Sequence, residues 1–541
     1  MDTYTLTIDS LDNEGRGIST LPNGKKIFIP GVLPDEECLI ELTKESSRYA
    51  EGVCTRLLTQ SQHRIQPHGV IIPGCNLAHL SYDQQVKYKQ NKVINCLTRI
   101  GHLPQEITSL VNDTVPSAIT SNYRNHMQYK IACGKVSLTA EGSNTPVPAE
   151  LCPLEYSVFS DIRKTIDDIF DVAPTTLFSG LVLRGSERTQ EVLMELVSDS
   201  EDTHERIINA TNNYLAASSM VQKIKDAISD YNLRGITLRM SRSAVEKRTR
   251  GGKRVLITGE DFYTETLCGR TFKIKAGAFF QVNIPQAEVL YKLASESIAN
   301  AKTVCDIYCG TGSIGLSVLH EGQQLLGVES VSEAVASAKE NAALSGVANA
   351  KFICKPAEKI NFQEEKLPTP IAAIVDPPRQ GLDFAFVNHL LKLAPDSISY
   401  VSCDPATMAR DLAQIVGSGK YEIRSVTPVD MFPQTSHVET VVQLSKGSVP
   451  SQDVKVKFSM ENVSSAQYLD KPATYEQIKA YVKEHSGLNV SSLYIAQVKQ
   501  KYGIIERDCY NLPKSDDSRQ PKCPEHKEKA IVDALTYYKM I

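Results

Sequence analysis

Cys403 stands in a short polar turn, a setting in which a thiol can act as a nucleophile. An apolar run ends at Ser402, and Asp404-Pro405 opens a predicted helix directly afterwards. A helix N-terminus lowers the pKa of a thiol and favours the thiolate, which is the nucleophilic form. An isolated cysteine is more often a small buried apolar residue, but the polar turn favours the reactive interpretation.

A carboxylate and an imidazole follow in the segment VDMFPQTSHVE, which ends at Glu439. The segment precedes a final predicted strand, Thr440 to Leu444. A carboxylate held near a nucleophile can remove a proton as a general base, and His437 would orient it. On its own, Glu439 would indicate only solvated surface.

A glycine-rich turn, CGTGSIG, follows the apolar strand predicted from Thr303 to Tyr308. Glycines in such a turn let the backbone approach a ligand at a helix N-terminus, and Glu329 at the end of the next strand can bind ribose hydroxyls. The pattern also occurs in nicotinamide dehydrogenases and in turns that bind nothing. The polar Asp306 within the strand and the late position in the chain favour S-adenosylmethionine.

Asp376 begins a second turn, DPPRQGL, at the end of the strand predicted over 371–375. Two prolines make this turn rigid, and in open α/β sheets it lies at the edge where ligands bind. Its carboxylate can accept hydrogen bonds from a base or a cofactor. The alternative role for Asp376 is a plain helix cap.

These motifs in this order resemble the RNA uridine carbon-5 methyltransferases of the RumA/TrmA type, from residue 1 to about 445. The strings YVSCDPATMARDL, VDMFPQTSHVE and FFQVN carry the resemblance. It implies that Cys403 is the nucleophile and Glu439 the general base. It also implies a cofactor site for S-adenosyl-L-methionine formed by Gln281, Tyr308, Gly310, Ser313, Glu329 and Asp376. Ser313 occupies a position that is often Asn in the family, so its cofactor contact is the least supported.

The chain departs from the family at one place. Many members that act on ribosomal RNA bind an iron–sulfur cluster through a C-P-H-x3-C-x2-C run and one distant cysteine. Here Gln66 and Ile72 replace two of those ligands, while Cys75 and Cys152 remain. Four thiolates normally bind such a cluster, so the sequence predicts no iron–sulfur cluster and no other metal.

Methylation of uridine at carbon 5 would require residues of these types. Attack of the Cys403 thiolate on carbon 6 would make an enolate and activate carbon 5, which then takes the methyl group. Glu439 would remove the carbon-5 proton, so that the thiolate can leave. The uridine must leave its stack to reach the thiol, so we expect a flipped or unpaired base.

The elements that position these residues predict an α/β fold with four parts. Residues 1–62 indicate a five-stranded barrel of the OB type, which resembles the family's RNA-binding TRAM domain. Residues 63–275 indicate a mixed α+β RNA-recognition domain, with a helix at 79–101 started by a Ser81–Gln84 capping box. Residues 276–446 alternate strands and helices as a Rossmann-like, doubly wound sheet. Residues 447–541 indicate a small helical extension.

Composition sets the remaining limits. The 541 residues carry a net charge of −4 and 41% hydrophobic residues, and no apolar run is long enough to span a membrane. Thirteen cysteines with no visible secretory signal indicate a reducing, cytoplasmic setting. We expect a monomer. RNA contact must come from a local basic patch, for which the candidates are Arg234, Arg239, Arg242, Lys247, Arg248, Arg250, Lys253 and Arg254.

Three functions remain open at this stage. The first is RNA uridine methylation, with 23S ribosomal RNA favoured over tRNA because of the attached barrel. The second is an NAD(P)-dependent oxidoreductase, which would leave Cys403 and Glu439 unexplained. The third is a non-catalytic RNA-binding protein on a methyltransferase scaffold, against which the intact Cys403 and Glu439 argue.

Overall fold

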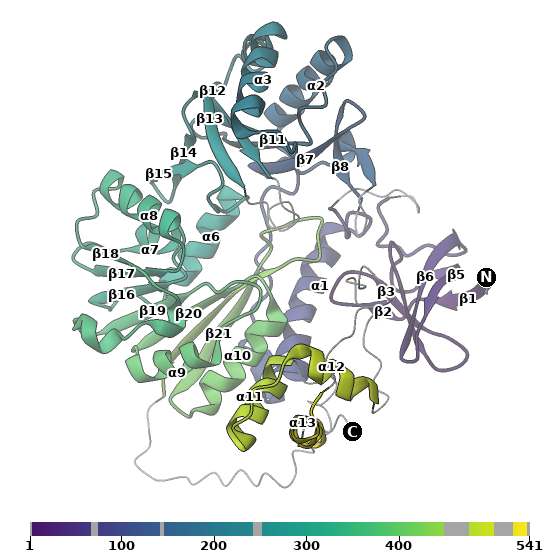
Figure 1. Cartoon of the computed structure of the whole chain (residues 1–541), viewed down its shortest axis with the longest axis vertical. Coiled ribbons are helices and arrows are strands. Elements are labelled where there is room, and N and C mark those ends of the chain that lie inside the picture. Colours follow the sequence, from purple (N-terminus) through teal and green to yellow (C-terminus); the bar gives the residue numbers. More distant parts are fainter. Residues whose placement is uncertain are drawn as a thin grey trace. The chain divides into compact units, whose positions relative to one another are not determined.

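A computed structural model describes residues 3–66, 74–140, 145–241, 252–447, 475–501 and 523–537. The chain divides into two compact units, Met1–Val449 and Pro450–Ile541. Figure 1 shows the elements of both units along the chain. Within the described residues, no helix is both long and apolar enough to cross a membrane.

The N-terminal sheet has six strands in the order β1-β5-β6-β4-β3-β2. They are β1 Thr3–Thr7, β2 Ser10–Leu11, β3 Gly17–Thr20, β4 Lys26–Ile29, β5 Glu37–Glu45 and β6 Tyr49–Leu57. The expected five strands are therefore six, because the two-residue β2 is too short to leave a pattern in the sequence. Alternate residues of these strands, such as Ile27, Ile29 and Ile40, form a separate small core.

The helix expected over 79–101 is α1, Tyr82–Asn95, followed by a π-helical turn, η1, Cys96–Ile100. The capping-box interpretation is wrong, because the Ser81 side chain makes no cap hydrogen bond. Instead, the Ser81 carbonyl accepts from the backbone N–H groups of Gln84 and Gln85. A 3-10 turn, η2, Gln105–Leu110, leads into the central domain.

The central domain is built on a seven-stranded sheet in the order β13-β12-β11-β10-β7-β8-β9. Its elements are β7 His126–Ala132, β8 Lys135–Thr139, β9 Pro146–Pro148, η3 Ala149–Leu151, α2 Ser157–Val172, β10 Gly180–Ser186, β11 Glu191–Ser198, α3 His204–Ala217, α4 Met220–Ala227, β12 Asn232–Met240 and β13 Lys253–Gly259. Helices α2 and α3 lie on one side of this sheet (Figure 1). A two-stranded ribbon, β14 Phe262–Leu267 and β15 Arg270–Lys275, connects it to the catalytic domain.

The catalytic domain is the predicted doubly wound sheet, with strand order β18-β17-β16-β19-β20-β22-β21. Its elements are α6 Ile284–Ser295, β16 Thr303–Ile307, α7 Ser313–Val318, β17 Gln324–Glu329, α8 Ser332–Leu344, β18 Ala350–Cys354, η4 Ala357–Lys359, η5 Phe362–Glu365, β19 Ile371–Val375, α9 Phe384–Leu393, β20 Ser397–Ser402, α10 Pro405–Gly417, β21 Tyr421–Val429 and β22 Glu439–Lys446. Helices α6, α7 and α8 cover one face, and α9, α10 and α1 cover the other (Figure 1).

The C-terminal unit contains three described helices, α11 Tyr475–Ser486, α12 Ser492–Lys501 and α13 Glu525–Tyr537. Its core is its own and contains Ile478, Val482, Ile495, Ile531 and Leu535. Gly487 follows α11, Ser491 precedes α12 and Pro524 precedes α13, positions that these residue types often take at helix ends.

Candidate active site

Cys403 and Glu439 meet because two neighbouring strands run in opposite directions. Strand β20 ends at Ser402, which pairs with Thr440 near the start of the antiparallel β22. One step further along the same register, Cys403 follows β20 and Glu439 begins β22. The antiparallel pair of β20 and β22 thus brings a thiol and a carboxylate to the same edge of the sheet.

The expectation that the helix N-terminus lowers the pKa of Cys403 is wrong. Burial, the neighbouring Glu439 and then Asp376 raise the pKa of this thiol to about 12 in the protein alone. Asp404 explains why the helix does not compensate. Its carboxylate accepts hydrogen bonds from Ala406 N (2.8 Å) and Thr407 N (3.1 Å), so α10 already has an anion at its N-terminus.

Glu439 is a buried carboxyl group with a raised pKa. It is 5% exposed, and burial followed by the charge of Asp376 raises its pKa to about 8. Burial raises the pKa of Asp376 to about 7. Arg379, in the same DPPRQGL turn as Asp376, opposes these shifts, because it lowers the pKa values of both Glu439 and Cys403. The sequence motif DPPRQGL contains Arg379 but does not indicate this effect.

His437 does not orient Glu439 as expected. Within the described residues, no hydrogen bond joins the two side chains. The His437 ring packs edge-on against Phe432 at 6.2 Å between centroids. Burial and then Arg379 lower its pKa to about 4, so the ring is neutral at physiological pH.

The segment that carries His437 and Glu439 is fixed by α1, which the sequence did not indicate. Lys89 is fully buried and forms an ion pair with the equally buried Asp430. Lys89 also donates to Phe432 O at 2.9 Å. Gln85 and Gln434 bond each other twice, at 3.0 Å and 2.9 Å. The buried face of α1 is therefore partly polar.

The residues implied for the cofactor gather at the carboxyl ends of β16, β17 and β19. Glu329 Oε2 accepts from Gly310 N at 3.2 Å, so the glycine turn and the acid are in contact. Ser313 begins α7, and its Oγ lies 3.0 Å from the hydroxyl of the buried Tyr291. Tyr308 has a φ of 64° and packs edge-on against Phe386.

The same edge has the properties that a nucleoside cofactor requires. A Cβ at Gly310, where φ is 53°, would have no atom within 4 Å, so space is open above the turn. Asp306 Oδ2 accepts from Gly315 N at 2.9 Å, while its buried Oδ1 has no partner in the described structure. Burial raises the pKa of Asp306 to about 7. Glu329 supplies an acceptor beside this space.

Gln281 lies in the loop before α6, apart in sequence from the other residues implied for the cofactor. It is 6% exposed, and its carbonyl accepts from Asn125 Nδ2 at 3.0 Å, which ties the loop to the central domain. Two residues earlier, Phe279 is 73% exposed. An apolar ring this exposed is a feature that the FFQVN string contained without identifying it.

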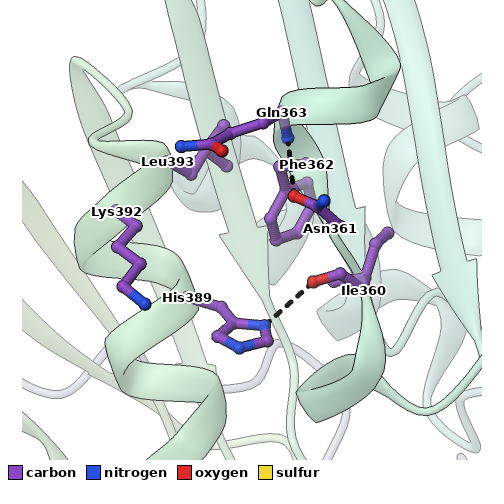
Figure 2. Close-up of a pocket in the computed structure, with 7 residues that line it drawn as sticks. All are labelled: Ile360, Asn361, Phe362, Gln363, His389, Lys392 and Leu393. Atoms are coloured by element: carbon purple, nitrogen blue, oxygen red, sulfur yellow. Dashed lines mark hydrogen bonds between the residues drawn. The ribbon is translucent and has the colours of Figure 1, made fainter.

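A hollow of about 380 Å³ also lies on the catalytic domain, but it is distinct from the candidate active site. Figure 2 shows it between α9 and residues 360–363, where His389 Nδ1 bonds Ile360 O at 2.9 Å. None of the residues predicted for catalysis or cofactor binding lines it.

The two cysteines that remain of the cluster motif, Cys75 and Cys152, lie next to each other. Cys75 and Cys152 are both buried, and a hydrogen bond between them raises the pKa of Cys75 and lowers that of Cys152. Gln66 belongs to the described residues, while Ile72 lies outside them. Among the described residues no group of three metal-ligating side chains occurs.

The basic patch is only partly described. Arg242, Lys247, Arg248 and Arg250 lie outside the described residues. Of the others, Arg234 pairs with Glu191 at 3.4 Å, and Glu195 bonds both Arg239 Nε at 2.8 Å and Arg254 Nε at 2.7 Å. Glutamates therefore hold these arginines in place on the sheet.

Comparisons with known proteins identify the family. The family described as tRNA (uracil-5-)-methyltransferase matches residues 221–447, and the TRAM domain matches residues 2–55. An RNA methyltransferase of Oceanobacillus iheyensis is 31% identical over 464 residues, which are 82% of this chain and 96% of that protein. One of Staphylococcus aureus is 31% identical over 460 residues, which are 81% of this chain and 97% of that protein.

A solved structure supports the fold. The tRNA (uracil-54, C5)-methyltransferase of Pyrococcus abyssi, in complex with S-adenosyl-L-homocysteine, matches with a TM-score of 0.64 and 24% identity. The match covers 81% of this chain and 99% of that one. The chain belongs to the family of RNA uracil-5-methyltransferases, whose members depend on S-adenosyl-L-methionine.

Proposed function

We propose that this enzyme methylates carbon 5 of one uridine in structured RNA through a covalent adduct between Cys403 and carbon 6. The observation that supports this most directly is the register of β20 and β22, which sets a thiol and a buried carboxylate side by side. Residues 1–62 and 63–275 would bind the RNA, and residues 276–446 would carry out the reaction.

Each residue has one task in the proposed reaction. Gln281, Tyr308, Gly310, Ser313, Glu329 and Asp376 would hold S-adenosyl-L-methionine. When bound, this cosubstrate supplies an electrophilic methyl group and a cationic sulfonium, whose charge lowers the pKa of nearby acids. That charge would offset the burial that keeps the Cys403 thiol protonated. Cys403 then bonds to carbon 6, and carbon 5 takes the methyl group.

Glu439 completes the cycle. It would remove the proton from carbon 5, so that the electron pair of that C–H bond restores the double bond and expels the thiolate. Arg379 would stabilise the anions that form around it. The intact pair of Cys403 and Glu439 disfavours both a nicotinamide oxidoreductase and a non-catalytic RNA-binding protein.

We favour 23S ribosomal RNA as the substrate because of the N-terminal barrel. tRNA is the second candidate, since the matching family and the Pyrococcus abyssi enzyme are both named for tRNA. Nucleoside mass spectrometry of the two RNA classes, from cells with and without the gene, tests the function. Loss of 5-methyluridine from one class identifies the substrate, and unchanged 5-methyluridine in both would refute the proposal.

Cys403→Ala tests the assigned nucleophile. The variant should lose methylation and still bind S-adenosylhomocysteine with nearly the wild-type affinity, because Cys403 does not belong to the proposed cofactor site. A loss of cofactor affinity as large as the loss of turnover would contradict this role.

A further inference from the structure

One face of the central sheet is not covered by α2, α3 or α4, the described helices of this domain. Residues such as Met127, Leu181 and Met194 point into the core formed with α2, α3 and α4. Because side chains alternate along a strand, their neighbours point to the other face. These neighbours are largely polar and more often basic than acidic: Gln128, Lys130, Arg184, Glu195, Thr237, Arg239 and Arg254.

A hollow of about 230 Å³ lies on this face. Its sides include Gln128, Lys130, Asp199 and Arg239, and Val182 lies among them. Arg239 is 6% exposed, and Glu195 fixes it through an ion pair of 2.8 Å. We call this cavity the sheet hollow.

A continuous set of contacts connects the sheet hollow with the loop that carries Gln281. Glu195 bonds Arg239 on the hollow side and Arg254 on the other. The Arg254 guanidinium lies so close to Gly277 that a Cβ there would be 2.7 Å from it. Arg184 donates to Ala278 O at 2.6 Å. The next residue is the exposed Phe279.

We propose that the sheet hollow binds one unpaired nucleotide of the substrate RNA, other than the uridine that is methylated. This inference rests on the proposed function. Gln128 and Asp199 offer amide and carboxylate groups that suit the hydrogen-bonding edge of a base. Lys130 and Arg239 offer cations to its phosphate.

The dimensions and the location of the hollow favour this ligand. At about 230 Å³ it is smaller than the ~300–1,000 Å³ typical of sites for drug-sized ligands, so it suits a single nucleotide unit. Its lining combines donors, acceptors and cations. The contacts from Arg239 to Ala278 connect the hollow with the loop that carries Gln281, a residue proposed for the cofactor site.

Two variants test the proposal by different routes. Val182→Phe should fill the hollow, and Gln128→Ala should remove one polar contact without adding volume. Each should raise the KM for the full-length RNA substrate by about tenfold, which corresponds to about 1.4 kcal/mol. The kcat and the affinity for S-adenosylhomocysteine should stay at the wild-type values.

Matched controls lie on the helical side of the same domain. Val172→Phe places the same ring at the end of α2, where Val172 is 82% exposed. Gln222→Ala removes the same amide from the exposed side of α4. Both controls should keep the wild-type KM.

The outcomes separate this inference from the proposed function. A wild-type enzyme that forms no 5-methyluridine in any RNA would refute the function itself. A wild-type enzyme that methylates RNA, together with an unchanged KM in Gln128→Ala and Val182→Phe, would overturn the sheet hollow alone. If Val182→Phe also lost affinity for S-adenosylhomocysteine, the added ring would have disturbed more than the hollow. The KM of Gln128→Ala would then decide the question.

Discussion

In the proposed reaction Glu439 accepts a proton only after methyl transfer, and this timing can be tested. Glu439→Gln keeps the shape of the side chain and removes the acceptor, so attack and methyl transfer should proceed while elimination stops. Turnover should fall by about 10²–10⁴-fold, the usual contribution of a positioned base. A covalent complex with methylated RNA should accumulate and appear as a slowly migrating band that resists denaturant.

The double variant Cys403→Ala, Glu439→Gln provides the control, because without the thiol no adduct can form. If Glu439→Gln turned over near the wild-type rate and trapped no complex, another group would be the base. His437 would be the first alternative, since its lowered pKa keeps the ring neutral and able to accept a proton.

The raised pKa of Glu439 predicts a specific pH dependence. Because Glu439 must be ionised to act after methyl transfer, kcat should rise with pH and level off above about 8. The stability contribution of Glu439 should instead fall as pH rises. A carboxyl group with a pKa raised by folding stabilises the protein below its unfolded pKa of about 4.3 and loses that contribution as pH rises through the folded value. Glu439→Gln should therefore unfold at a higher temperature than wild type at pH 9 and show little difference at pH 5.

The two remaining cysteines of the cluster motif lead to a prediction about iron. Cys75 and Cys152 provide two thiolates where a cluster needs about four. The protein purified without exposure to air should contain no stoichiometric iron by metal analysis. About four irons per chain would show that other ligands complete a cluster.

At the scale of elements, α1 holds the catalytic segment through a buried charge pair. Lys89→Met would leave Asp430 buried without its partner, which typically costs about 3–5 kcal/mol. Turnover should fall with it, because Phe432 and the residues that lead to Glu439 lose their anchor. Lys87→Met is the matched control, two positions away on the exposed side of α1.

The denaturation midpoint and the turnover of the two variants provide the measurement. Lys87→Met should change stability by no more than roughly 0.5 kcal/mol, as surface substitutions usually do. Equal effects of the two substitutions would show that helix packing in general, and not the pair with Asp430, supports the segment.

The elements themselves were largely predictable from the sequence, and the supports of the site were not. Helix α8, Ser332–Leu344, lies in the stretch where the sequence predicts alternating strands and helices, because such patterns are local signals. The local pattern failed on the helix expected over 79–101, where Ile100, in η1, is 40% exposed while Gln85 and Lys89 of α1 are buried. Their partners lie more than 340 residues away in the sequence, so no local pattern could reveal them.

The prediction of a lowered pKa for Cys403 failed for a related reason. The helix after Cys403 was correct, yet its effect on the thiol depends on neighbours that only folding brings together. Asp404 occupies the helix N-terminus, and Glu439 and Asp376 add negative charge nearby. A motif identifies which residue reacts, while the pKa of that residue is a property of the assembled site.

At the scale of the whole molecule, the two units have separate cores. The cores of the catalytic domain use residues before 447, and the core of the C-terminal unit uses residues 478–535 only. The family matches end at residue 447, and alignments that cover 96% of a relative use 82% of this chain. We therefore expect the chemistry to need nothing that the C-terminal helices contribute to the fold.

A chain of residues 1–447 should consequently bind S-adenosylhomocysteine and unfold as the first unit of the full chain does. Its kcat should stay within about threefold of the full chain, which corresponds to less than ~0.7 kcal/mol of transition-state free energy. A raised KM for RNA at unchanged kcat would show that the second unit contributes to RNA binding. A lost kcat with intact cofactor affinity would instead contradict the assignment of the whole reaction to the first unit.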